Sequence, residues 1–161
     1  MQTITIREIK QNDNPAVAKV IRDVLIEHDV PRVGTAYADP ELDAMFEAYN
    51  NPGSVYFVLE KDDKIVGGAG IAPLQKGHES VCELQKMYFL LEARGRGLGS
   101  LLIEKCLLAA KEMGYKKCYL ETMPYMQNAQ RLYLRTGFTY LKEPMGNTGH
   151  GASPVWMLKD I

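Results

Sequence analysis

The amino-acid sequence predicts a single α/β domain, with a mixed, mostly antiparallel central sheet of about seven strands and about four flanking helices. Three observations support this prediction. The chain has 161 residues, close to the usual size of one domain, so we expect that domain to span residues 1–161. Its composition, 46% hydrophobic and 24% charged, is that of an ordinary globular protein. Its elements change along the chain from hairpins to a strand, a glycine-rich turn, a helix and a strand.

One strand and two helices are expected before residue 50. Residues 3–8 alternate apolar and polar side chains, which is typical of a half-buried strand. The first helix is predicted to begin with Asn14 as its N-cap and Pro15 in its first turn. The second helix is predicted to begin in the same way, with Asp39 and Pro40. Apolar residues then recur at helical spacing in both, so each helix has one apolar face.

Three antiparallel strands are predicted next, at 55–59, 65–72 and about 80–89. A charged turn joins the first two, and a turn at Lys76 and Gly77 joins the last two, which is the pattern of consecutive hairpins. The middle strand contains several glycines, and glycine weakens a strand unless another backbone or a ligand must approach it closely.

The second half of the chain begins with a long helix at 98–113, which is apolar over a wide face. A short strand at 117–121 follows it, and this order fits a helix packed against a sheet. The remaining predicted elements are a short helix at 128–135 and two strands at 138–141 and 155–158.

Charge and cysteine content argue against several classes of protein. Nineteen Lys and Arg residues and 20 Asp and Glu residues give a net charge of -1, so nucleic acid or an anionic membrane would exert no bulk attraction. No segment has the length and apolar character of a membrane span or a signal peptide. Cys82, Cys106 and Cys118 lack Cys-x-x-Cys spacing, so we expect reduced core residues in a cytoplasmic protein. No metal site is predicted.

The segment Arg-Gly-Arg-Gly-Leu-Gly at 94–99 lies between a predicted strand and a predicted helix. Backbone N–H groups and the positive end of the helix dipole meet at such a turn, where they can bind phosphate. The glycines permit close approach of a ligand, and Arg94 and Arg96 add positive charge. The alternative is a tight turn that only packs the helix on the sheet.

The spacing of the glycines restricts the kind of phosphate ligand. A Walker loop requires Gly-Lys-Ser/Thr, which is absent from the segment. A dinucleotide fingerprint would place Ser100 at its third glycine, and Glu121 stands where an acidic ribose ligand could follow. That fold also requires several more parallel strands, whereas the preceding residues favour hairpins, so we regard it as the weaker alternative.

The pattern Arg94-x-x-Gly97-x-Gly99 resembles the pyrophosphate-binding pattern (Gln or Arg)-x-x-Gly-x-(Gly or Ala) of the GNAT N-acetyltransferase superfamily. Further segments in family order are Glu83-Leu84-Gln85-Lys86-Met87-Tyr88-Phe89, Leu120-Glu121-Thr122 and Asn128-Ala129-x-x-Leu132-Tyr133-x-x-x-Gly137-Phe138. The resemblance covers residues 55–138 closely. It implies a GNAT domain in which the strand before the turn splays from its parallel neighbour at the cofactor site.

The resemblance implies acetyl-CoA as cofactor, with its pantetheine arm between the splayed strands and its pyrophosphate on the glycine-rich turn. The residues implied in cofactor binding are Met87, Tyr88, Phe89, Arg94, Gly95, Arg96, Gly97, Leu98, Gly99, Ser100, Asn128 and Tyr133. Asn128 matches an asparagine that contacts the cofactor arm, and a helix N-cap is an equally good interpretation of it.

Three groups are implied in catalysis. The backbone N–H of Phe89 matches the donor to the developing oxyanion. Tyr133 matches the tyrosine that protonates the departing sulfur, although its helical spacing with Ala129 and Leu132 also fits a core residue. Glu83 stands where some family members carry a catalytic base, and the alternative is a solvated or ion-paired strand residue.

The acceptor is expected to contact the loops at 28–38 and 143–154. Candidate contacts are Arg32, Tyr37, Tyr125 and His150, although residues of these types are more often ordinary surface residues. We therefore expect acetyl transfer to a primary amine of a small molecule or amino-acid-like acceptor in a ternary complex. The alternatives are a protein or peptide amine acceptor and a non-catalytic acyl-CoA sensor. We expect no nucleic acid or membrane partner, and a homodimer stays open.

Overall fold

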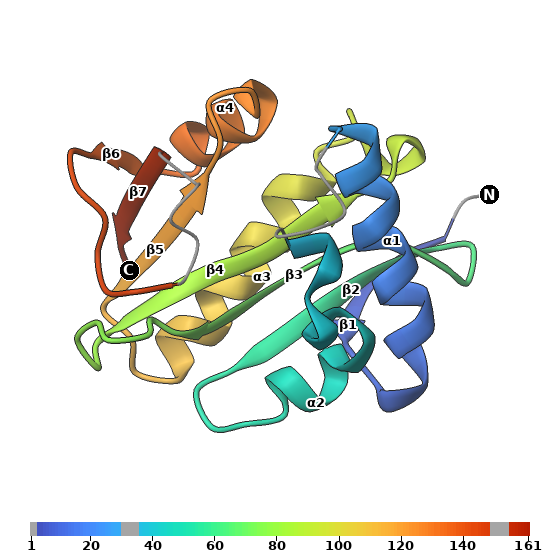
Figure 1. Cartoon of the computed structure of the whole chain (residues 1–161), viewed down its shortest axis with the longest axis horizontal. Helices are drawn as coiled ribbons and strands as arrows, with labels where there is room; N and C mark the ends of the chain where they lie inside the picture. Colours follow the sequence, from blue (N-terminus) through green and yellow to red (C-terminus); the bar gives the residue numbers. More distant parts are fainter. Residues whose placement is uncertain (1–2, 30–35, 149–154) are drawn as a thin grey trace.

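The computed structural model describes residues 3–29, 36–148 and 155–161. The strands are β1 (Ile4–Glu8), β2 (Val55–Lys61), β3 (Lys64–Pro73), β4 (Val81–Phe89), β5 (Lys117–Thr122), β6 (Thr139–Leu141) and β7 (Val155–Asp160). They form one sheet in the order β1-β2-β3-β4-β5-β7-β6, in which only β4 and β5 are parallel (Figure 1). The predicted α/β class and mostly antiparallel sheet are confirmed.

The helices lie on both faces of the sheet (Figure 1). The α-helices are α1 (Asn14–Glu27), α2 (Met45–Tyr49), α3 (Leu98–Glu112) and α4 (Gln127–Arg135). The short 3-10 helices are η1 (Gln11–Asp13), η2 (Ala36–Ala38), η3 (Pro40–Ala44) and η4 (Leu91–Ala93). None of the helices in the described ranges has both the length and the apolar character needed to cross a membrane.

Two hydrophobic clusters hold the helices to the sheet. α1 and α2 pack on Tyr56 and Val58 of β2. On the opposite face α3 and Tyr133 of α4 pack on the first half of β4 and on β5. The latter cluster includes the three cysteines, which are fully buried and form no disulfide.

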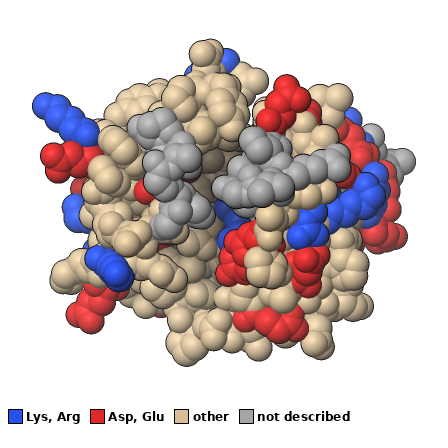
Figure 2. Space-filling model, viewed as in Figure 1, with Lys and Arg blue, Asp and Glu red and all other residues tan. Residues whose placement is uncertain are grey.

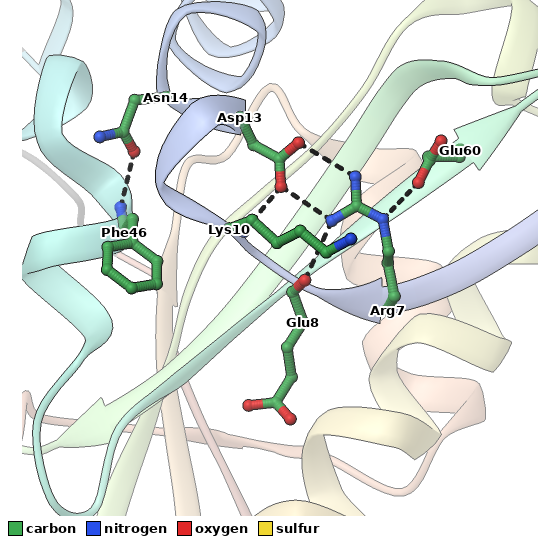
Figure 3. Close-up of polar contacts among 7 residues, drawn as sticks. All are labelled: Arg7, Glu8, Lys10, Asp13, Asn14, Phe46 and Glu60. Carbon is green, nitrogen blue, oxygen red and sulfur yellow. Dashed lines mark hydrogen bonds and ion pairs between the residues drawn. The ribbon is translucent and has the colours of Figure 1, made fainter.

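The starts of the first two helices differ from the sequence prediction. Asp13, not Asn14, is the N-cap residue of α1, because η1 leads directly into the helix. The Asn14 side chain instead accepts a hydrogen bond from the N–H of Phe46 at 2.8 Å, which joins α1 to α2 (Figure 3). Asp39 does cap the next segment, since its carboxylate accepts from the N–H of Glu41 at 2.9 Å. That segment is divided into η3 and α2 rather than forming one helix.

An ion-pair network joins β1, η1 and β2 (Figure 3). Arg7 donates to both carboxylate oxygens of Asp13, at 2.8 and 3.0 Å, and also bonds to Glu60. The N–H of Lys10 donates to Asp13 at 2.7 Å. The hydrogen bond from Arg7 lowers the pKa of Asp13 despite the burial of that carboxylate.

The glycines of β3 are required by the aromatic rings that cover the strand. A Cβ added to Gly70 would lie 2.6 Å from the ring of Tyr56, and one added to Gly67 would lie 2.7 Å from the ring of Phe89. The close approach expected from these glycines is therefore made by aromatic side chains, which leaves this part of the strand no room for a bound ligand.

Candidate active site

β4 and β5 separate immediately after Glu83. Their ladder consists of Val81 with Lys117, Cys82 with Cys118 and Glu83 with Tyr119. Beyond this point β4 pairs only with β3 within the described ranges. Figure 1 shows the two strands diverging toward the end of the sheet where α4 and the C-terminal end of α1 lie. The predicted splay is confirmed, and one edge of the second half of β4 faces the gap.

The backbone N–H of Phe89 points into this gap. The N–H of the next residue, Leu90, donates to the carbonyl of Val66 beside β3 at 2.8 Å. Donor directions alternate along an antiparallel strand, so the N–H of Phe89 is directed away from β3. The carbonyl of Phe89 accepts from Nε and Nη2 of Arg94, at 3.0 and 2.7 Å. The N–H of Phe89 is thus a backbone donor that faces the gap at this end of β4.

A β-bulge in β4 changes which residues face each side of the sheet. The register slips between the Gly68–Tyr88 and Gly70–Gln85 pairs, and Lys86 in the bulge has a φ of 49°. Before the bulge, Gln85 bonds to Tyr49 of α2. After it, Met87 and Phe89 pack on the α3 side. Tyr88 packs on the α1 and α2 side.

The glycine-rich turn leads into α3 and leaves open space above two of its glycines. Gly95 and Gly97 have φ values of +75° and +73°, and a Cβ on either would meet no atom within 4 Å. Leu98 is the first residue of the helix and is buried, and Ser100 lies in the first turn. The first N–H groups of a helix have no acceptor within it, so they are available to a ligand at this turn.

The other predicted residues of the turn have structural contacts. A Cβ on Gly99 would lie 2.6 Å from Leu132, so this glycine allows α3 to approach α4. Besides its bonds to the Phe89 carbonyl, Arg94 donates to both carboxylate oxygens of Glu27, at 2.5 and 2.8 Å. Arg94 thereby holds the C-terminal end of α1 to the end of β4. Arg96 is exposed on the turn.

Tyr133 and Asn128 lie on α4. The Tyr133 ring is buried, with its centroid 6.0 Å from that of Phe138, and burial raises the pKa of its hydroxyl. That hydroxyl has no hydrogen bond among the described residues, and no described side-chain oxygen is both buried and unpaired, so it reaches solvent. Asn128 is exposed and accepts from Arg131. α4 begins at Gln127, so the N-cap interpretation of Asn128 is wrong.

Glu83 lies on the α2 side of β4, at a cavity of about 370 Å³. The cavity is lined by Asp39, Glu41, Ala48, Tyr49, Ser54, Ala72, Pro73, Gln75, Glu83, Gln85, Lys86 and Thr148. Glu83 is only 3% exposed, and this burial raises its pKa to about 7. Figure 2 shows acidic side chains gathered beside a hollow in the middle of this face, over η3 and α2.

The contacts of Glu83 involve two residues that sequence reasoning missed. Nε2 of Gln85 donates to Oε1 of Glu83 at 2.5 Å, and the hydroxyl of Tyr49 donates to Oε1 of Gln85 at 2.6 Å. The alternation of a strand could have indicated Gln85, which is two residues from Glu83. No local pattern connects Tyr49 of α2 with β4.

Two of the four predicted acceptor contacts, Tyr37 and Tyr125, lie in the described part of the chain. The Tyr37 ring is 5.6 Å from the guanidinium carbon of Arg22 on α1. Tyr125 is half exposed, and its ring centroid is 6.2 Å from that of His28 at the end of α1. Neither tyrosine lines the cavity at Glu83. Arg32 and His150 lie outside the described residues. Over the described ranges, no three side chains of His, Cys, Asp or Glu could hold a metal ion.

The one parallel strand pair of the described sheet diverges, and an open glycine-rich turn follows it at a helix N-terminus. These two features together define an acetyltransferase of the GNAT class. The model of the acetyltransferase (GNAT) family matches residues 22–138. YjgM of Escherichia coli (strain K12), named as an uncharacterized N-acetyltransferase, is 42% identical over 99% of this chain and 96% of its own length. The chain belongs to the GNAT family and is an N-acetyltransferase.

Solved structures share the fold. A GNAT-family acetyltransferase from Staphylococcus aureus Mu50 has a TM-score of 0.86 at 20% identity, over 98% of this chain and 99% of that one. A phosphinothricin acetyltransferase from Sinorhizobium meliloti, solved with AcCoA, has a TM-score of 0.80 at 18% identity, over 99% and 89% of the two chains. At sequence identities of 20% and 18%, these similarities are evidence of a shared fold alone.

Proposed function

We propose that this enzyme transfers the acetyl group of acetyl-CoA to a primary amine of a small molecule or amino-acid-like acceptor, by direct attack while both are bound. The divergence of β4 and β5 carries the proposal, because it leaves the N–H of Phe89 facing a gap beside the glycine-rich turn. The AcCoA complex of the Sinorhizobium meliloti neighbour supports this choice of acetyl donor.

The residues at the gap fit a CoA thioester. The space above Gly95 and Gly97, which a Cβ would fill, is open to a pyrophosphate beside the first N–H groups of α3. We propose that Met87, Tyr88 and Phe89 bind the pantetheine arm, that residues 94–100 bind the pyrophosphate, and that Asn128 contacts the arm from α4. Arg94 would keep its bonds to the Phe89 carbonyl, leaving Arg96 as the nearer source of positive charge. The thioester supplies an activated acetyl group.

Three groups of the chain would serve the transfer. Glu83, with a pKa raised to about 7, is partly ionised at neutral pH and would take a proton from the ammonium form of the acceptor, directly or through water. The N–H of Phe89 would donate to the thioester oxygen as negative charge develops there. The Tyr133 hydroxyl, which keeps its proton at neutral pH, would protonate the departing sulfur.

The cavity at Glu83 is the proposed acceptor site. Its described lining carries Asp39, Glu41 and Glu83 against one basic residue, Lys86, which is paired with Glu41 at 2.7 Å. Such a lining favours an acceptor that arrives as an ammonium ion. We also propose a cytoplasmic location, because all three thiols are buried and unpaired, and we propose no nucleic-acid partner, given the net charge of -1.

A thiol-release assay with acetyl-CoA and a panel of amines, amino acids and peptides tests this function. We expect saturable thiol release with small amines, and no release with any acceptor would favour an acyl-CoA sensor. In calorimetric titrations with acetyl-CoA, Gly97→Glu is expected to abolish binding by filling the phosphate cradle with a charged side chain. Gly114→Glu is the matched control, because Gly114 also has a positive φ and open space but follows the far end of α3. Equal losses in both variants would contradict the pyrophosphate assignment.

A further inference from the structure

The carboxylate of Glu83 is held by one side-chain donor. Nε2 of Gln85 donates to its Oε1 at 2.5 Å. The second oxygen, Oε2, has no hydrogen bond among the described residues, and since no described side-chain oxygen is both buried and unpaired, it keeps some contact with solvent. Glu83 lines the acceptor cavity, so one oxygen is fixed while the other remains available there.

The orientation of the Gln85 amide is set by Tyr49. The Tyr49 hydroxyl lies 2.6 Å from Oε1 of Gln85, and burial raises the pKa of Tyr49 well above its ordinary value. The hydroxyl therefore keeps its proton and donates a hydrogen bond to the amide oxygen, which faces Tyr49. The NH₂ group must then face Glu83, where an ionised carboxylate is its natural acceptor.

Other groups around Glu83 do little to stabilise the ionised form of its carboxylate. The charged and titratable neighbours are Lys86 of β4, Glu121 and Tyr119 of β5, Tyr49 of α2, and Asp39 and Glu41 at the start of η3. Burial and the charge of Glu121 raise the pKa of Glu83, whereas Gln85 and Lys86 lower it. The ammonium of Lys86 is itself paired with Glu41. The hydrogen bond from Gln85 is thus the strongest interaction that favours the ionised form.

We infer that Gln85 is a positioning residue for Glu83: its amide, held by Tyr49, fixes one carboxylate oxygen and leaves the other free to take the acceptor's proton. This inference rests on the proposed function, in which Glu83 is the base. It assigns roles to Gln85 and Tyr49 through the hydrogen bonds that connect them with Glu83.

Gln85→Leu tests the inference through the pH profile of kcat/KM. The base acts when it is deprotonated, and loss of the Gln85 donor raises its pKa, so the acidic limb should move to higher pH by about one unit. Activity near pH 6 should then fall about tenfold and approach the wild-type value above pH 9. A purely structural role would lower activity at every pH without moving the midpoint.

A titration of the Glu83 carboxyl carbon by ¹³C NMR measures the same effect without turnover. We expect Gln85→Leu to raise the midpoint by about one unit, and Tyr49→Phe to raise it by less. The double variant should shift no further than Gln85→Leu, because Tyr49 acts through Gln85. This titration separates the two proposals: if wild type acetylates no amine, the proposed function fails, while the midpoint still decides the role of Gln85.

Gln75→Leu is the matched control, since it removes another amide from the same cavity that has no bond to Glu83. We expect it to leave the midpoint in place, whatever it does to the KM of the acceptor. A midpoint that stays fixed in Gln85→Leu, or that moves equally in Gln75→Leu, would overturn the inference.

Discussion

At the scale of single residues, the site combines groups that local sequence indicates with groups that it does not. Glu83 stands out in the sequence because it interrupts an apolar strand. Its burial, and therefore its raised pKa, depends on the packing of α2 over β4, which no local pattern contains. Tyr133 illustrates the same division, because its helical spacing fits both a core ring and an acid. The structure shows that its ring is in the core while its hydroxyl reaches solvent.

Tyr133→Phe separates these two roles. Removing the hydroxyl should lower kcat about a hundredfold while the affinity for acetyl-CoA changes less than about twofold, because the ring and its packing remain. Steady-state kinetics and calorimetric titration provide the two measurements. Tyr115→Phe is the control, since it removes a buried hydroxyl that bonds to the carbonyl of Gly53 outside the gap. Equal losses of turnover and affinity in Tyr133→Phe would support packing alone.

At the scale of elements, sequence signals located the strands and helices better than they described their ends. Asp39 and Pro40 correctly marked a helix start, but the split into η3 and α2 follows from tertiary packing. The sequence does not indicate the bulge in β4. A left-handed backbone position is usually occupied by glycine or asparagine, and here it is occupied by Lys86. The sequence shows the glycines of β3, but it does not show the rings that require them, which belong to β2 and β4.

Gly70→Ala tests the role of these glycines. The added Cβ would lie 2.6 Å from the Tyr56 ring and 2.7 Å from the carbonyl oxygen of Val55, so the strand must shift. We expect the free energy of unfolding to fall by about 3 kcal/mol, measured by denaturant titration. The same change at Gly95, where space is open and only the positive φ opposes a side chain, should cost about 1 kcal/mol. A smaller loss at Gly70 than at Gly95 would contradict this account.

At the scale of the whole molecule, the sheet consists of two parts joined through a short ladder. β1 to β4 carry α1 and α2, and β5 to β7 lie beside α4 (Figure 1). Three residue pairs of β4 and β5 connect them, above a cluster shared by α3 and α4. The order of elements and the divergence could be predicted by resemblance to the family. The cavity at Glu83 could not be predicted, because its lining consists of residues far apart in the chain.

The network at the first edge of the sheet should govern stability in acid. Because the folded-state pKa of Asp13 is depressed, its contribution is complete above the unfolded pKa of about 4 and is lost as pH falls through the lower folded value. Asp13→Asn should lower the free energy of unfolding at pH 7 by about 2 kcal/mol and flatten its decline in acid. Urea titrations between pH 7 and pH 3 measure both effects.

Asp43→Asn is the comparison for that experiment. Asp43 also pairs with an arginine, Arg22, but its side chain is 62% exposed, so solvent screens the pair. Its loss should lower the free energy of unfolding at pH 7 much less than the loss of Asp13 does. If both variants lost equal stability, burial of the Arg7 network would not explain its strength.

The bulge at Lys86 determines which residues of β4 face each side of the sheet. Glu83 and Gln85 line the cavity proposed for the acceptor, and the extra residue after them turns Met87 and Phe89 to the opposite face. If the strand instead ran regularly through Lys86, with no bulge, every residue beyond Lys86 would face the opposite side of the sheet. The bulge therefore decides which residues beyond Lys86 face each side, and a one-residue insertion after it should be far less tolerated than a substitution.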